Sequence, residues 1–99
     1  VENDIFNDNL EADNDFCEAL GIIQGEFLAI HPFREGNART IKLMTDLISL
    51  QSGRPLLVYD ATPKGIADYI TAAEAALQKA NYRPMIEVIH RALSAARRE

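Results

Sequence analysis

The chain has a single cysteine, few glycines and prolines, and no long apolar run. Cys17 has no second cysteine to pair with, which excludes an internal disulfide and indicates a reducing compartment. Five glycines and four prolines among 99 residues favour helices, and no stretch approaches the roughly 20 apolar residues that span a bilayer. We therefore expect one soluble, helix-rich domain. Cys17 is expected to be a small core residue rather than a nucleophile.

Positive charge is also missing from the first third of the chain. Residues 1–33 hold eight acidic side chains and no Lys or Arg, whereas residues 34–99 hold seven acidic and ten basic ones, and the formal net charge is -5. Since the basic residues neither cluster nor alternate with aromatic ones, we expect no nucleic-acid partner, and the lack of a membrane-spanning apolar run predicts no membrane partner. The first residues lack the cationic and apolar segments of a signal peptide. We expect a trimmed core in the cytoplasm rather than a targeted precursor.

Apolar spacing predicts the first helix. Residues 1–13 are rich in Asn and Asp, which favours a loop or a short docked segment. A helix capped by Asp13 or Asn14 should end near Ile30, because Pro32 disfavours helical backbone at the residue before it. The expected apolar stripe of this helix is Phe16, Leu20, Ile23, Phe27 and Ile30.

A second helix is predicted from Ala38 to Leu50 or Ser52. Its apolar residues are distributed around nearly the whole circumference, which is typical of a central helix. Gly53 and a following proline should end it. Residues 56–59 then form a buried extended connection that is too isolated for a sheet.

Capping signals predict two further helices. Thr62 caps a helix that has Pro63 in its first turn and ends near Ala80, and Pro84 opens a fourth helix. Their expected inward-facing residues are Ile66, Tyr69, Ile70, Ala73 and Leu77, and then Met85, Ile86, Ile89 and Leu93. The predicted fold is all-α, a compact bundle of about four or five helices. The first two helices should form an antiparallel hairpin around a seven-residue bend, which is the candidate active site.

The bend, with the helix start after it, carries the sequence His-Pro-Phe-Arg-Glu-Gly-Asn-Ala-Arg at residues 31–39. A Gly-Asn turn that leads into a helix N-terminus aims unpaired N–H groups at an anion. Arg39 can grip phosphate oxygens with two hydrogen bonds, Glu35 can hold a hard divalent cation, and His31 can deprotonate a hydroxyl near neutral pH. The group suits in-line phosphoryl or nucleotidyl transfer.

Simpler roles remain open for the same residues. His31 can be a surface or capping residue, Glu35 a solvated loop acid, and Asn37 the N-cap of the second helix, alone or in addition to binding phosphate. Phe33 is expected to anchor the bend in the core and is not counted as catalytic.

Lys42 also has two interpretations. It lies three residues after Arg39, on the same helical face, and can point toward a polyphosphate. It also precedes Asp46 by four residues, so that an ordinary surface ion pair can occupy it instead.

Residues 31–42 resemble the signature of the Fic (filamentation induced by cAMP) family, His-x-Phe-x-Asp/Glu-Gly-Asn-Gly-Arg-x-x-Arg. Six positions agree: His31, Phe33, Glu35, Gly36, Asn37 and Arg39. Two positions depart, since Ala38 replaces the second glycine and Lys42 the second arginine. Lysine lacks the planar fork of arginine, which weakens its grip on a terminal phosphate. Ala38 matters only if that position needs a positive φ or a close ligand approach.

The resemblance implies an all-helical, Fic-like core that transfers AMP from ATP, with Mg²⁺, to a Ser, Thr or Tyr hydroxyl of a target protein. In that reaction His31 would be catalytic and Glu35 would bind the metal. The residues that the resemblance assigns to nucleotide binding are Arg34, Glu35, Gly36, Asn37, Ala38, Arg39 and Lys42. The family association with bacterial effectors and toxins adds delivery into a host cell to the expected locations.

The resemblance also bears on partners. Complete Fic cores dock their targets on an upstream hairpin, which roughly fourteen residues before the first predicted helix cannot supply, so residues 1–99 are expected to be a single core fragment. The family's inhibitory motif, Ser/Thr-x-x-x-Glu-Gly/Asn, is incomplete because His31 stands four residues before Glu35. Any inhibitor should therefore be a separate, antitoxin-like protein. The alternatives are transfer of another phosphate-containing group, a catalytically weakened nucleotide-binding or interaction module, and a plain helical bundle.

Overall fold

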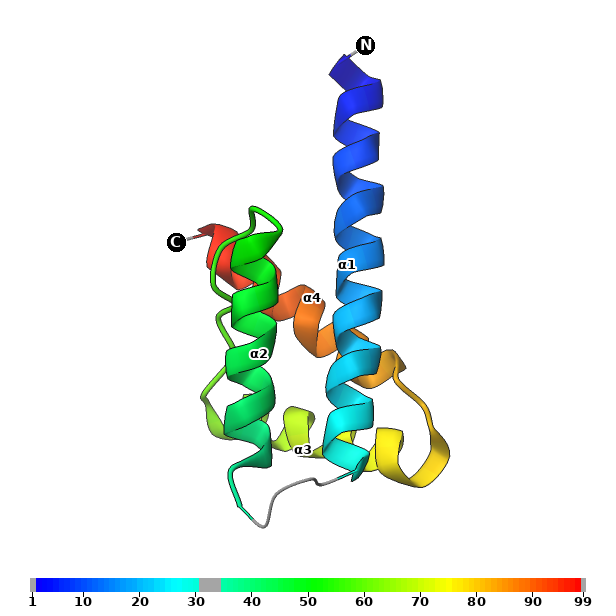
Figure 1. Cartoon of the computed structure of the whole chain (residues 1–99), viewed down its shortest axis with the longest axis vertical. Coiled ribbons are helices and arrows are strands. Elements are labelled where there is room, and N and C mark those ends of the chain that lie inside the picture. The colour runs from blue at the N-terminus through cyan, green and yellow to red at the C-terminus, as the bar shows by residue number, and fades with distance from the viewer. Residues whose placement is uncertain (1, 31–34, 99) are drawn as a thin grey trace.

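The computed structural model describes the backbone of residues 2–30 and 35–98, and the side chains of residues 11–30 and 35–98. These ranges contain four helices and no strand: α1 (Glu2–Ile30), α2 (Asn37–Gln51), α3 (Pro63–Lys79) and α4 (Arg83–Arg98). Helices α1 and α2 lie side by side and run in opposite directions, whereas α3 and α4 cross behind them (Figure 1). The all-α prediction and the antiparallel hairpin are confirmed.

Helix α1 begins eleven residues earlier than its predicted cap at Asp13. The loop expected over residues 1–13 is wrong, because the backbone is helical from Glu2. Acidic residues are favourable at a helix N-terminus, and the turn preference of Asn and Asp is weak enough to be overridden in a long helix. Asp13 is not a cap; its carboxylate instead pairs with Arg54 and Arg97.

The buried face of α1 differs from the predicted apolar stripe. Ile23 is exposed and Ile30 is 72% exposed, whereas the buried side chains are Cys17, Leu20, Gln24 and Leu28. Gly21 and Gly25 lie on this buried face, where a Cβ on Gly21 would stand 2.6 Å from the Ile86 Cα. The prediction followed large apolar residues alone, so it missed the face on which small residues let α4 approach the α1 backbone.

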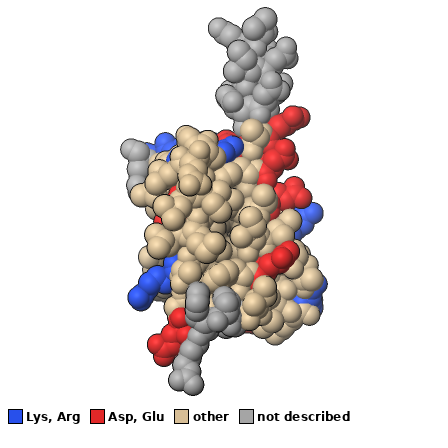
Figure 2. All heavy atoms as spheres, viewed as in Figure 1, with Lys and Arg blue, Asp and Glu red and all other residues tan. Residues whose placement is uncertain are grey.

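Helix α2 lies at the edge of the bundle, so the prediction that it is central is wrong. It packs against α1 through Ile41, and Thr45 and Ser49 are also buried on its inner side. Four large apolar side chains on its outer side are exposed, with Leu43 at 61%; the others are Met44, Leu47 and Leu50. Mostly uncharged side chains accordingly cover the face over α1 and α2, and acidic ones follow the α1 edge (Figure 2).

The segment between α2 and α3 contains no helix or strand, as predicted, and is held by hydrogen bonds. The predicted burial of residues 56–59 is only partly right, since Leu56 is 52% exposed. The Leu57 N–H donates to the Asp46 carboxylate at 3.2 Å, and the Val58 N–H donates to the carbonyl of Ala92 in α4 at 3.1 Å. Leu57 is buried, in a cluster with Cys17 and Leu20 of α1 and with Ile89, Ala92 and Leu93 of α4. The predicted core position of Cys17 is confirmed, and burial raises the pKa of its thiol to about 11.

The predicted boundaries of α3 and α4 agree with the structure. The Thr62 hydroxyl accepts from the Gly65 N–H, Pro63 begins α3, and Ala80 follows its end in a left-handed conformation. Met85, Ile89 and Leu93 of α4 are buried as expected. The predicted inner face of α3 is only partly right: Tyr69 and Ala73 are half-buried, whereas Ile66, Ile70 and Leu77 are exposed because α3 packs through Ala72 and Ala76.

Candidate functional site

The part of the bend that the structure describes begins at Glu35. His31, Phe33 and Arg34 lie outside the described residues. Glu35 is exposed at a bend in the backbone. Gly36 follows with φ 80° and ψ 14°, and its carbonyl accepts from the Thr40 N–H at 2.9 Å, which closes the first turn of α2. Glycine is needed here for its left-handed backbone rather than for space, since no atom lies within 4 Å of a Cβ added at this position.

Asn37 and Ala38 are the first residues of α2. The N-cap is Gly36, which has no side-chain capping bond, so the interpretation of Asn37 as the N-cap is wrong. Asn37 is the first helical residue and is buried. Ala38 is half-buried in regular helix, so the positive φ that would favour a glycine is not required at this position.

Arg39 and Lys42 differ in their surroundings. Arg39 is exposed, whereas Lys42 is half-buried and its ammonium stands 4.3 Å from the centroid of the Tyr69 ring and 4.9 Å from that of Tyr59. The predicted alternative of an ion pair between Lys42 and Asp46, both of which the structure describes, is wrong. The Asp46 carboxylate instead accepts from the backbone of the extended segment. Burial lowers the pKa of the Lys42 ammonium.

A buried polar network fixes the two tyrosines. Gln24 of α1 is fully buried; its amide nitrogen donates to the Tyr69 hydroxyl, and its carbonyl oxygen accepts from the Tyr59 hydroxyl at 3.1 Å. The Thr45 hydroxyl lies 3.1 Å from that of Tyr59. Burial raises the pKa of Tyr59 to about 12, and it also raises that of Tyr69. Both phenols therefore stay neutral at physiological pH.

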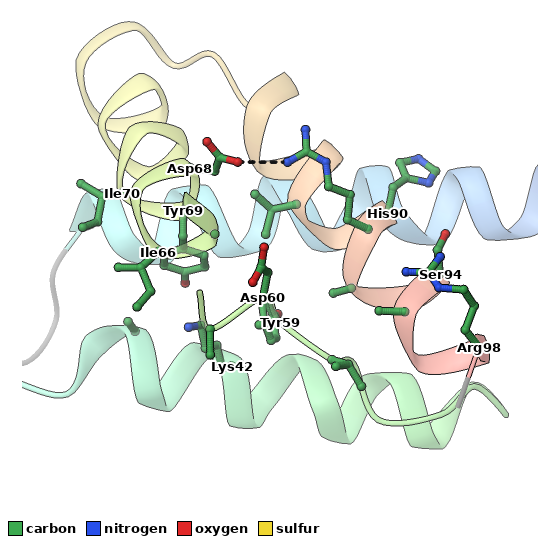
Figure 3. A pocket seen from close by; sticks show the side chains of 18 residues that line it. Lys42, Tyr59, Asp60, Ile66, Asp68, Tyr69, Ile70, His90, Ser94 and Arg98 are labelled. Carbon is green, nitrogen blue, oxygen red and sulfur yellow. Dashed lines mark hydrogen bonds and ion pairs between the residues drawn. The ribbon is translucent and has the colours of Figure 1, made fainter. Parts of the chain in front are cut away.

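The two tyrosines line a cleft of about 1020 Å³. Ala38 and Lys42 line it from α2, Tyr59 and Asp60 from the extended segment, Tyr69 and Asp68 from α3, and Arg91 from α4 (Figure 3). Arg91 pairs with Asp68 at 3.5 Å. The sequence predicted none of the tyrosines as site residues, because nothing in local spacing links residues 59 and 69 to residue 42.

The described residues can be compared with what a Mg²⁺ ion requires. They hold no group of three or more His, Cys, Asp and Glu side chains arranged to bind a metal by themselves. Magnesium in phosphate-transfer sites commonly uses one or two carboxylates, substrate phosphates and water. The exposed carboxylate of Glu35, beside the N-terminus of α2, fits that donor set.

Comparison with protein families identifies the segment that contains the bend. The model of the Fic/DOC family matches residues 2–49. The match supports the assignment of this segment to the Fic/DOC family. No curated protein and no solved structure gave a significant match to the chain. None of the described helices is both long and apolar enough to cross a membrane.

The Fic segment comprises α1, the bend and all but the end of α2. Ala38 and Lys42 of the cleft therefore belong to it, whereas Tyr59, Tyr69 and Arg91 lie beyond the matched residues. The cleft is thus a site that the Fic segment shares with the second half of the chain.

Proposed function

We propose that this chain is a protein adenylyltransferase that moves AMP from ATP to a hydroxyl side chain of a target protein. The observation that carries the proposal is the Fic/DOC match over residues 2–49, which includes the complete bend. The left-handed Gly36 at the start of α2 supports it, because this turn leads directly into a helix N-terminus, whose dipole favours an anion.

His31 is the proposed general base. The target hydroxyl oxygen attacks the α-phosphorus of ATP, the bond from that phosphorus to its bridging oxygen breaks, and pyrophosphate leaves. His31 takes the proton of the hydroxyl as the new bond forms. A neutral imidazole suits this step, since its usual pKa is about 6.5.

The remaining motif residues are proposed to hold the nucleotide. Asn37, with the backbone of Gly36 and Ala38, would bind phosphate oxygens at the positive end of α2. Arg34 and Arg39 would neutralise the departing pyrophosphate. Glu35 would hold Mg²⁺, which supplies positive charge to the phosphates when bound.

The test is transfer of label from ATP to protein. The chain is incubated with Mg²⁺ and a cell lysate, once with ATP labelled on the α-phosphate and once on the γ-phosphate. Relative to lysate without the chain, we expect additional protein label only from the α-phosphate, and we expect His31→Ala to reduce this labelling at least about 100-fold, the lower end of general-base contributions. Folding of the variant is checked by circular dichroism.

The binding roles need a matched pair of variants. Arg39→Ala should lower labelling, whereas Arg83→Ala, which removes an exposed arginine at the start of α4, should not. Additional γ label that depends on the added chain would instead assign phosphoryl transfer. Nucleotide binding without any labelled protein, for an intact chain, would contradict the proposed transfer and leave a binding module.

A further inference from the structure

The position of Lys42 is unusual for a lysine on a surface helix. Its ammonium faces two tyrosine rings, at 4.3 and 4.9 Å from their centroids, and among the described carboxylates none forms an ion pair with it. Two arginines of α4 also line the cleft: Arg91 is paired with both Asp68 and Glu87, and Arg98 is exposed at the end of the helix. Lys42 therefore brings a positive charge to the cleft that no neighbouring acid neutralises.

The two rings are themselves held in place. They meet edge to face, with centroids 6.1 Å apart and planes at 82°. Gln24, on the buried side of α1, forms hydrogen bonds with both tyrosine hydroxyls. Because Gln24 is fully buried, the rings cannot turn without breaking hydrogen bonds that water does not replace.

A lysine needs such support more than an arginine does. Its charge is carried on a flexible four-carbon chain and lacks the planar fork that orients a guanidinium on a phosphate. A cation over an aromatic face is attracted by the ring quadrupole, and the attraction increases when water is excluded. The half-buried ammonium of Lys42 meets both conditions.

We propose that Tyr59 and Tyr69 are positioning residues, which hold the Lys42 ammonium on the cleft wall so that it meets the terminal phosphates of the bound nucleotide. This proposal rests on the function proposed above. Ala38, one turn before Lys42 and on the same side of α2, lines the same cleft and connects it to the start of the helix. The second half of the chain would thus complete the phosphate site of the Fic segment.

The decisive comparison is Tyr69→Leu against Tyr69→Phe. Both variants lose the hydroxyl and its bond to Gln24, but only the leucine variant also loses the ring. Affinities for ATP and for AMP, each with Mg²⁺, are measured by calorimetry. We expect Tyr69→Leu to weaken ATP binding about three- to tenfold relative to Tyr69→Phe, in the range of a partly desolvated cation–π contact, and to leave AMP binding unchanged.

A double-mutant cycle tests whether the effect passes through Lys42. In a Lys42→Met background, the Tyr69→Phe and Tyr69→Leu variants should bind ATP with equal affinity. The Lys42 ε-CH₂ resonance gives a second readout, since ring currents should shift it upfield in the parent and in Tyr69→Phe, and less in Tyr69→Leu, where only the Tyr59 ring remains. Inorganic triphosphate, used as a probe without the nucleoside, should show the same dependence as ATP.

The outcomes separate this proposal from the proposed reaction. Equal weakening of ATP and AMP binding, or a ring effect that persists in Lys42→Met, would overturn the positioning role even if protein labelling is observed. Absence of labelling, together with the predicted coupling between Tyr69 and Lys42 in ATP binding, would overturn only the transfer reaction. A parent chain that binds neither ATP nor triphosphate would overturn both.

Discussion

At the scale of single residues, Gln24 is the polar side chain on which the arrangement of the cleft wall depends. It is fully buried in α1 and bonds to tyrosines that come from two other segments of the chain. A buried hydroxyl that loses its partner retains the cost of desolvation without the compensating bond. Gln24 therefore links the stability of the bundle to the position of the two tyrosine rings that face Lys42.

We predict that Gln24→Leu lowers the free energy of unfolding by about 1–3 kcal/mol, since it leaves the two phenols short of a partner while conserving much of the side-chain volume. Urea unfolding followed by circular dichroism measures the change. Gln78→Leu, an exposed glutamine of α3, is the matched control and should change stability by less than about 0.5 kcal/mol. Equal effects from the two substitutions would contradict a role for the network.

Also at this scale, the sequence predicted the motif but not its surroundings. Gly36 has the positive φ that its turn requires, and Ala38 lies in regular helix, in agreement with the helix predicted from Ala38 onward. The N-cap interpretation of Asn37 was wrong, because the glycine before it takes that position. The contacts of Lys42 with residues 59 and 69 join positions 17 and 27 apart, and no local rule of spacing reaches that far.

At the scale of elements, the contact of α1 with α4 depends on Gly21, which has no side chain. A Cβ on Gly21 would lie 2.6 Å from the Ile86 Cα and 2.8 Å from its backbone nitrogen. Since backbone cannot move aside as a flexible side chain can, the helices would have to separate. The glycine at this position therefore sets the distance between α1 and α4.

Gly21→Ala is predicted to destabilise the chain by about 1–3 kcal/mol, although alanine is the better helix former by about 1 kcal/mol. Asn14→Ala, on the exposed side of the same helix, gains helix propensity without a clash and should be neutral or slightly stabilising. Thermal unfolding of both variants compares the two effects. A stabilised Gly21→Ala variant would show that the interface tolerates the added methyl group.

The helices themselves illustrate what sequence patterns can and cannot predict. Caps act locally, so Thr62 and Pro63 correctly marked the start of α3. Burial depends on what lies opposite, and here the predictions were weaker: Leu43 resembles a core residue by its type but faces outward on an edge helix. The run of Asn and Asp before Asp13 favoured a loop, yet the helix continues through it.

At the scale of the whole molecule, Asp13 ties three distant parts of the chain together. Its carboxylate on α1 accepts from Arg54, in the segment after α2, with 3.0 Å between Nε and Oδ1, and from Arg97 near the end of α4. The Arg54 guanidinium also lies over the Phe16 ring at 4.1 Å. The Asp13 side chain, which is 19% exposed, thus connects the acidic first third of the sequence to two arginines of the more basic remainder.

The hydrogen bond with Arg97, followed by that with Arg54, holds the pKa of Asp13 below its usual value of 3.8, against the opposing effect of burial. Because the folded-state pKa is the lower of the two, this contribution to stability is fully present above pH 3.8 and is lost as the pH falls through the folded-state pKa. Asp13→Asn should therefore lower the unfolding free energy at pH 7 by about 1–2 kcal/mol, a value reduced for partial exposure. The difference from the parent should shrink toward zero in strong acid.

The control is Asp15→Asn, which changes an exposed neighbour on α1 and should follow the parent across the pH range. Urea unfolding from pH 2.5 to 7 measures all three, and a constant difference between parent and Asp13→Asn down to the lowest pH would show that packing rather than charge pairing holds these three segments together.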